Sequence, residues 1–154
     1  RVGGLEKEDN TGNVSYDSEN HQHMTNIRQA KVDAIAESIP LIETYGDSSG
    51  SLLLVSWGGT FGSVRSAVVH ARANNLSVSH IHIRHINPFP KNLGEILLKF
   101  ENVLIPELNA GQLSIILRNK YLVDSVGLNK VEGKPFTTEE IYNKILEIIG
   151  TNNA

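Results

Sequence analysis

A glycine-rich turn is the first feature of the sequence that could carry chemistry. It reads WGGTFG over residues 57–62 and lies between an apolar run and a helical pattern. Strand, turn and helix units of this kind bind phosphate when their glycines hold a fixed spacing. Starting from Gly58, the dinucleotide fingerprint requires glycine where Thr60 stands, and Gly62 lacks the Lys-Ser/Thr pair of the other common phosphate loop. The spacing therefore favours a tight turn over an anion site, with backbone freedom at Gly58 and Gly59 and with Thr60 capping the next helix.

Closely spaced histidines are the second feature, because imidazole is a common metal ligand. They form two groups, HQH at residues 21–23 and HIHIRH at residues 80–85. On a strand, His80 and His82 would face the same side. A tetrahedral or catalytic site needs three protein ligands supported by carboxylates, and Glu19 is the one acid near either group in the sequence. The pattern favours polar histidines near a surface, and no metal ligand is assigned.

Other catalytic arrangements find little support. The chain has no cysteine and no Gly-x-Ser-x-Gly elbow. Glu107 ends an apolar run beside Asn109, which is a suitable place for a general base. A carboxylate there more often accepts hydrogen bonds from loop amides, and we favour that role. The prolines of NPFP at residues 87–90 predict a rigid bend, with Phe89 available as an apolar contact.

Apolar periodicity predicts strands that alternate with helices. Strands are expected at residues 52–56, 78–86, 103–108 and 124–131, and helices at residues 21–39, 64–71, 93–100, 112–121 and 137–149. Asn20 or Ser18 is expected to cap the first helix and Thr137 the last. Such alternation predicts an α/β fold, a three-layer sandwich with a mainly parallel sheet, in which ligands and partners meet the carboxyl ends of the strands.

Composition limits the classes of function. The 154 residues are 40% hydrophobic and 20% charged, which suits one globular domain, and no apolar run approaches the roughly 20 residues of a membrane span. The net charge of −3 comes without a basic cluster, so neither nucleic acid nor membrane is an expected partner. Without cysteine the chain can hold no iron–sulfur cluster and no thiolate zinc site.

The charge and composition also suggest a division of the chain. Residues 1–20 read as an extended acidic arm or inter-domain linker, residues 21–150 as a single α/β domain, and residues 151–154 as a tail. The chain begins with Arg1 and shows no secretory signal, so we expect a piece of a longer, cytoplasmic protein.

Five stretches together resemble a known family. They read GLEKEDNTGNVSYDSENHQHMTNIRQAK, WGGTFGSVRSAV, NPFPKNLGE, PELNAGQLSIILRNKYL and GKPFTTEEI, and they span nearly the whole chain. They are similar to the C-terminal part of the alpha subunit of 2-oxoacid:ferredoxin oxidoreductases, in particular the 2-oxoglutarate type. Two positions depart from the pattern expected of that family: Lys7 stands where histidine is usual, and Gly59 stands where serine is usual.

The resemblance implies a fold like the transketolase C-terminal domain and a role in assembly. Family members decarboxylate a 2-oxoacid on thiamine diphosphate, pass electrons to ferredoxin and release an acyl-coenzyme A. The resemblance implies that thiamine diphosphate, magnesium and the iron–sulfur cluster lie elsewhere in the complex, with no cofactor in this fragment. The implied partners are the beta subunit and the preceding alpha-subunit domain, with ferredoxin and coenzyme A acting at the level of the complex.

The main hypothesis is therefore an assembly domain that is not catalytic by itself. No catalytic, cofactor-binding or metal-binding residue is assigned. The residues predicted to form strand-end loops or an interface are Gly58, Gly59, Thr60, Asn87, Pro88, Phe89, Pro90, Glu107, Asn109, Gly111 and Gln112. Two alternatives stay open: a free-standing module that binds a small anion or nucleotide, and the same domain within a lipoamide-using 2-oxoacid dehydrogenase.

Overall fold

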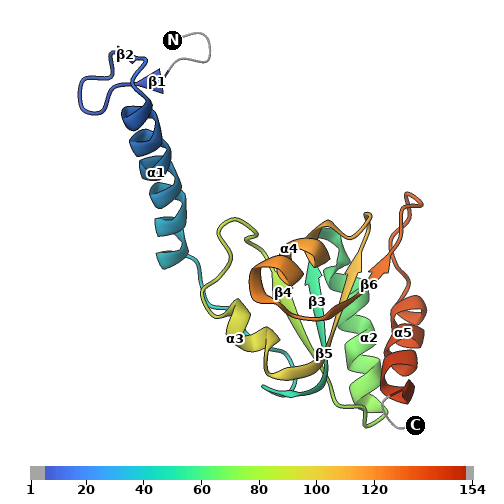
Figure 1. Ribbon diagram of the computed structural model, residues 1–154. Coiled ribbons are helices and arrows are strands. Elements are labelled where there is room, and N and C mark those ends of the chain that lie inside the picture. The colour runs from blue at the N-terminus through green and yellow to red at the C-terminus, as the bar shows by residue number, and fades with distance from the viewer. Residues whose placement is uncertain (1–5, 152–154) are drawn as a thin grey trace.

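The computed structural model describes residues 6–151, which form an α/β body and an extension that projects from it (Figure 1). Residues 1–5 of the predicted arm and residues 152–154 of the predicted tail lie outside the described part. Each helix within residues 6–151 is too short or too polar to cross a membrane. The division at residues 20 and 150 stays a prediction.

Four parallel strands form the sheet of the α/β body. They are β3 (Gly50–Trp57), β4 (Val78–Ile83), β5 (Phe100–Glu107) and β6 (Ser125–Asn129). Their spatial order is β4-β3-β5-β6, so β3 and β5 lie in the middle, and every neighbouring pair is parallel. This arrangement confirms the predicted α/β class and the four predicted strands.

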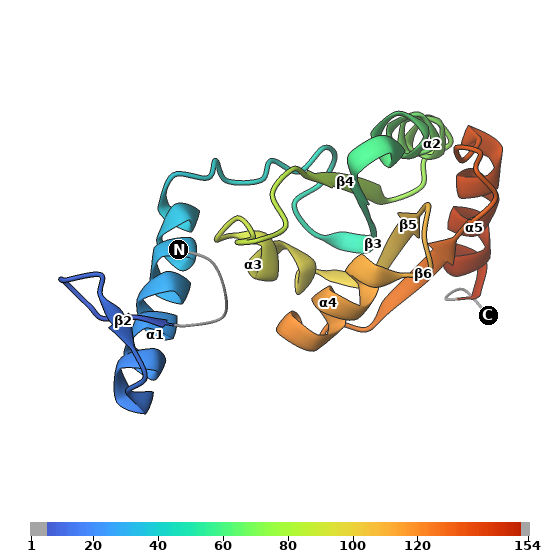
Figure 2. The same cartoon turned by 90° about the horizontal axis from the view of Figure 1, so that it is seen from above.

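Helices cover both faces of the sheet and make three layers, as Figures 1 and 2 show from two directions. Helices α3 (Leu93–Leu97) and α4 (Gln112–Tyr121) cover one face, and α2 (Phe61–Ala73) and α5 (Thr138–Thr151) cover the other. Side chains on β3 alternate between them: Leu53 and Val55 pack with α3 and α4, and Leu52 and Leu54 pack with α2 and α5. The chain's own helices thus close both hydrophobic clusters.

The ends of several elements differ from the predicted ones. A helix was expected over residues 93–100, but α3 ends at Leu97, and Phe100 instead begins β5, paired with Gly50. Gly94 explains why α3 approaches α4 closely, since a Cβ there would lie 2.8 Å from the Tyr121 ring. At the start of α5, the prediction is confirmed: Thr137 Oγ1 accepts from the Glu140 amide at 3.1 Å, and Glu140 accepts in return from the Thr137 amide.

The extension begins with a two-stranded hairpin, β1 (Glu6–Lys7) and β2 (Val14–Ser15), followed by helix α1 (Ser18–Ala34). Residues 6–20 were expected to belong to an arm without regular structure, which the hairpin contradicts. The helix expected over residues 21–39 is present, but it begins at Ser18 and ends at Ala34. Asp17, not Asn20 or Ser18, caps α1 by accepting a hydrogen bond from the Asn20 amide at 2.7 Å. No side chain of α1 is buried, so the helix stands apart from the α/β body.

Polar contacts attach the hairpin to α1. Glu6 Oε2 accepts from Arg28 Nη2 at 2.8 Å and contacts His21 Nδ1 at 3.1 Å. The hydrogen bond from Arg28, joined by one from the Lys7 amide, lowers the pKa of the Glu6 carboxyl to about 2. Asn20 adds a bond to the Lys7 carbonyl oxygen at 2.9 Å. The hairpin therefore depends on charge and hydrogen bonds rather than on a hydrophobic core.

Candidate functional site

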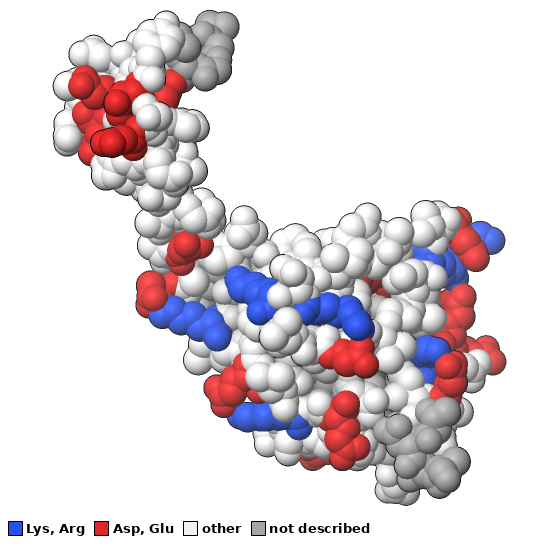
Figure 3. All heavy atoms as spheres, in the orientation of Figure 1, with Lys and Arg blue, Asp and Glu red and all other residues white. Residues whose placement is uncertain are grey.

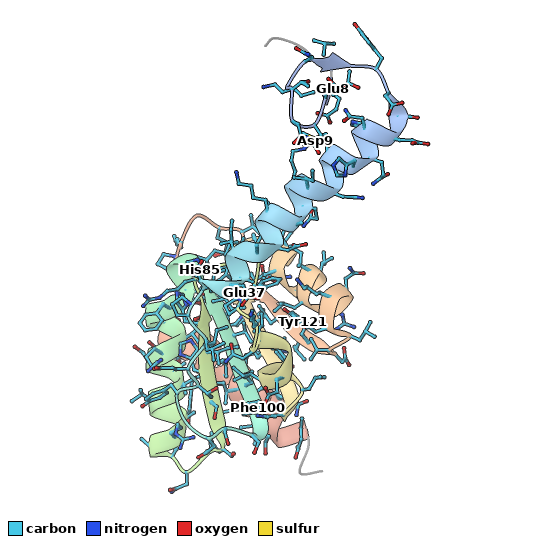
Figure 4. The ribbon with its side chains drawn as sticks, turned by 90° about the vertical axis from the view of Figure 1, so that its left-hand side faces the viewer. Glu8, Asp9, Glu37, His85, Phe100 and Tyr121 are labelled. Carbon is cyan, nitrogen blue, oxygen red and sulfur yellow. The ribbon has the colours of Figure 1, made fainter. Side chains whose placement is uncertain are left out.

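The carboxyl edge of the sheet gathers most of the residues singled out from the sequence. Because the four strands are parallel, the turns that follow β3, β4 and β5 all open at this edge. Figure 4 labels His85 at this edge, close to the end of the extension at Glu37, and Phe100 at the opposite edge. The three predicted strand-end loops therefore lie next to one another in space.

The turn after β3 is built by Gly58 and Thr60. Gly58 has a φ of 52°, which favours glycine, whereas Gly59 has an ordinary φ and open space around it. The Thr60 hydroxyl is buried and does not cap α2 as predicted. It donates to the Trp57 carbonyl oxygen at 2.9 Å and accepts from the Trp57 amide at 3.2 Å. Thr60 therefore closes the turn by bonding back to the backbone of Trp57, the last residue of β3.

The NPFP bend packs inward. Its Asn87–Pro88 peptide is cis. Phe89 is only 5% exposed and lies in the cluster under α3 and α4, with its ring centroid 6.1 Å from that of Tyr121. The apolar contact predicted for Phe89 is therefore made within the core, because the rigid bend turns this ring inward. The neighbouring Ile86 is 42% exposed and offers an apolar surface instead.

Glu107 accepts hydrogen bonds from the start of α4. Its side chain is fully buried, and its two carboxylate oxygens accept from the Leu113 and Ser114 amides, both at 2.9 Å. These amides belong to the first turn of the helix, where the helix dipole also favours a negative charge. The carboxylate therefore has the hydrogen-bonding role expected of it, with both oxygens in use.

Asn109 and Gly111 complete the same turn. Asn109 Oδ1 accepts from the Gly111 amide at 2.7 Å and from the Gln112 amide at 3.1 Å. Gly111 has a φ of 96°, and a Cβ there would lie 3.1 Å from Asn129 Nδ2, so the position suits glycine. Gln112 is exposed. The loop is thus organised by its own polar groups.

The two histidine groups lie in different parts of the molecule. His21 and His23 lie on α1, where they contact Glu6 and Asp9 of the hairpin rather than Glu19. Figure 4 labels Asp9 at the far end of the extension. His80 and His82 lie on β4 in the α/β body. Among the described residues, no three histidine or acidic side chains gather where they could hold a metal ion.

His80 and His82 share a partner that the sequence did not reveal. The Ser56 hydroxyl on β3 lies 2.7 Å from His80 Nε2 and 2.8 Å from His82 Nδ1. Arg65 on α2 donates from Nε to His80 Nδ1 at 3.0 Å. The sequence offered one indication of this group, the two histidines two residues apart. Ser56 lies beside His82 only through the pairing register of β3 with β4, which the sequence did not predict.

A hollow of about 540 Å³ opens beside this group. Its walls come from the segment at residues 40–45, from the first turns of α2 and from the end of β4. Its polar side chains include Arg65, His82, Arg84, His85 and Glu43. The sequence pattern indicated neither this hollow nor a role for Arg65.

Burial and neighbouring arginines keep the imidazoles of this group neutral. Burial lowers the pKa of His80 to about 3, helped by the charge of Arg65. Burial also lowers the pKa of His82, helped by the charges of Arg84 and Arg65. Near neutral pH, both rings therefore carry one proton each.

Comparison with known proteins places the chain in a family. It is 44% identical over 142 residues to the 2-oxoglutarate oxidoreductase subunit KorA of Mycobacterium tuberculosis, covering 92% of this chain and 21% of the relative. Other relatives are alpha subunits of 2-oxoacid:ferredoxin oxidoreductases. The chain is homologous to one part of these alpha subunits. It spans about a fifth to a quarter of their length. No protein-family model matches the sequence.

Solved structures agree with this family. A 2-oxoglutarate:ferredoxin oxidoreductase from Magnetococcus marinus superposes with a TM-score of 0.87 at 27% identity, over 93% of this chain and 26% of that chain. A split-gene transketolase superposes with a TM-score of 0.53 at 15% identity, over 71% of this chain and 42% of that chain, which shows a shared fold alone. The predicted family and the predicted transketolase-like fold are both confirmed.

The role of Glu107 predicts a loss of stability on substitution. Glu107→Gln places an amide N–H group against a helix amide that needs an acceptor, which should lower the free energy of unfolding by about 1–3 kcal/mol. Urea denaturation of the 154-residue chain measures the change. Glu101→Gln, at an exposed position of the same strand, is the control and should change stability by less than about 0.5 kcal/mol. Equal stability of the two variants would contradict the capping role.

The lowered pKa of His80 predicts acid sensitivity. Between pH 6.5 and pH 3 the unfolded chain binds a proton that the folded chain excludes. The free energy of unfolding should therefore fall with falling pH, by up to about 1.4 kcal/mol per pH unit from this group. His80→Gln should make the slope shallower in urea denaturation across this range.

His85→Gln removes an exposed histidine close to the same strand and is the matched control. It should leave the slope as it is in the unchanged chain. A slope that His80→Gln does not alter would show that this ring titrates alike in the folded and unfolded chain.

Proposed function

We propose that this chain is an assembly domain of the alpha subunit of a thiamine-diphosphate-dependent 2-oxoacid:ferredoxin oxidoreductase, with 2-oxoglutarate as the preferred 2-oxoacid. The observation that carries the proposal is the match to a subunit of that activity over 92% of this chain at 44% identity, while only 21% of the relative is spanned. The complete complex would decarboxylate the 2-oxoacid oxidatively and form an acyl-coenzyme A.

The state of the polar groups at the carboxyl edge supports a role that is not catalytic. Glu107, Asn109 and Thr60 all use their side-chain oxygens in hydrogen bonds to nearby backbone. A general base needs a lone pair directed at a substrate proton, and Glu107 has both oxygens engaged by α4 amides.

The described residues do not fit the cofactors of the complex. A magnesium diphosphate site needs oxygen ligands gathered at one point, and residues 6–151 offer no cluster of three acidic or histidine side chains. An iron–sulfur cluster needs thiolates, and the sequence has no cysteine. These cofactors would be held by other parts of the complex.

Exposed apolar side chains support an assembly role. Phe61, Ile86 and Leu108 are each about 40% exposed and lie in the turns of the carboxyl edge. On the extension, Ile27 of α1 is 41% exposed and Ile35, which directly follows α1, is 50% exposed, and no side chain of α1 is buried by the described residues. We propose that the carboxyl edge contacts the beta subunit and that the extension leads from the preceding alpha-subunit domain.

Charge distinguishes the extension from the body. On the face drawn in Figure 3, the tip of the extension shows acidic side chains and no lysine or arginine, whereas basic side chains lie on the α/β body. The acidic residues include Glu8 and Asp9, which Figure 4 labels at this tip. An acidic tip suits contact with a basic surface on a neighbouring domain.

The alternatives to this proposal receive less support. A free-standing module would not be expected to align along nearly its whole length with one part of a longer subunit. A lipoamide-using dehydrogenase is disfavoured because the relatives are named as oxidoreductases that use ferredoxin.

Assembly through the carboxyl edge predicts that a charge at Leu108 weakens the complex. Leu108→Asp in the full-length alpha subunit, expressed with the beta subunit, should reduce the fraction that co-elutes in size-exclusion chromatography, because a buried carboxylate without a partner costs several kcal/mol. Leu146→Asp on α5 is the matched control, since Leu146 is 42% and Leu108 is 39% exposed. Dissociation by Leu146→Asp alone would place the interface on the other face.

The absence of a catalytic role predicts no cofactor binding. Calorimetric titration of the 154-residue chain with thiamine diphosphate and magnesium should give no binding in the micromolar range. The complete alpha–beta complex is the positive control. Micromolar binding by the chain alone would overturn the proposal that its residues leave the cofactor to other domains.

A further inference from the structure

The hollow beside β4 combines free hydrogen-bond donors with an apolar wall. Leu41, Ile42 and Pro90 supply apolar atoms. Arg65 and Arg84 supply positive charge, which the single acid Glu43 offsets in part. The described lining is therefore cationic, and a volume of about 540 Å³ suits a small organic molecule.

Arg65 determines where the protons of the buried group lie. An arginine Nε–H can only donate, so His80 Nδ1, 3.0 Å away, must accept. A neutral His80 then carries its proton on Nε2 and donates to the Ser56 hydroxyl oxygen at 2.7 Å.

Ser56 in turn determines which ring nitrogen of His82 carries the proton. Its hydroxyl proton has two candidate acceptors, His82 Nδ1 at 2.8 Å and the Ile81 carbonyl oxygen at 3.5 Å, and the shorter contact is the stronger one. His82 Nδ1 therefore accepts, and the ring proton of His82 lies on Nε2. This N–H group has no partner among the described residues, and His82 lines the hollow.

Arg65 also keeps donors free for the hollow. Its guanidinium lies over the Tyr45 ring, 3.9 Å from the centroid, which holds the group in one plane. With Nε engaged by His80, the two terminal nitrogens have no hydrogen-bond partner within residues 6–151. Arg84 is exposed and forms no ion pair with any described residue.

We propose that the hollow binds a small organic anion, whose carboxylate or phosphate group accepts hydrogen bonds from Arg65 and His82. Arg84 adds charge at the rim, and the apolar part of the ligand lies against Leu41 and Ile42. Carboxylates and phosphates both present oxygen pairs that match a planar guanidinium. Leu108, whose substitution tests the assembly role, is not among the lining residues of this site, so the two proposals are tested separately.

Nuclear magnetic resonance of the histidine rings tests the proposal in the 154-residue chain with nitrogen-15 label. Without ligand, the ring nitrogens of His80 and His82 should both report protonation at Nε2. Benzoate, phenyl phosphate and inorganic phosphate are the probes. The organic probes should shift the His82 Nε2 signal in a saturable way, and the difference between benzoate and phenyl phosphate shows which oxoanion is preferred.

Variants separate a built site from general surface charge. Arg84→Met should weaken binding by about tenfold, because a positive charge at the rim is lost at an exposed position that does not affect the core. Glu43→Gln should strengthen binding several-fold by removing the opposing charge. Lys134→Met removes an exposed positive charge from another loop and should leave the affinity unchanged.

Ser56→Ala tests the chain of hydrogen bonds itself. It should release His82 from the fixed Nε2–H form, giving a mixture of the two neutral ring forms, and should weaken binding. Three results would overturn the proposal: His82 protonated on Nδ1 in the unchanged chain, no saturable shift with either organic probe at about 10 mM, a concentration that would detect even millimolar affinity, or equal weakening by Lys134→Met and Arg84→Met.

Discussion

Burial of β3 on both faces is the constraint on which the α/β body depends. Leu52, Leu53, Leu54 and Val55 are all fully buried, and each such side chain contributes roughly 1.5–3 kcal/mol when removed from water. A strand that is apolar on both sides needs helices on both faces, and its parallel neighbours need crossover connections. The same constraint places the turns after β3, β4 and β5 at one edge, where the candidate sites lie.

The two halves of that edge use their polar groups differently. On the side of β5, Glu107 and Asn109 bond to amides at the start of α4, so the groups that look chemically active in the sequence support the fold. On the side of β4, Arg65 and His82 keep donors that no described residue uses. The polar groups of the β5 half are thus already hydrogen-bonded within the chain, whereas the free donors of the β4 half suit a ligand.

The extension is held together by different interactions from those of the α/β body. Its hairpin is attached to α1 by Glu6, Arg28 and Asn20 through polar contacts, and α1 buries no side chain. Exposed ion pairs and hydrogen bonds contribute little stability in water. Such a helix gains most of its stability from packing, so a neighbouring domain that covers it would complete the structure of the extension.

The sequence by itself determined the order of strands and helices, because apolar periodicity is a local property that each segment carries alone. Residues 112–121 were predicted as a helix with the bounds that α4 has, and Thr137 was predicted to cap the last helix from its residue type just before the helical pattern. Tertiary structure decided the features that depend on contacts between distant segments. Helix α3 ends at Leu97 because Phe100 must pair with Gly50, and Phe89 turns inward where α3 and α4 leave room for its ring. The group that joins Arg65, His80, Ser56 and His82 exists only because sheet register and the packing of α2 bring together hydrogen-bonded pairs whose members are 15 to 26 residues apart in the chain.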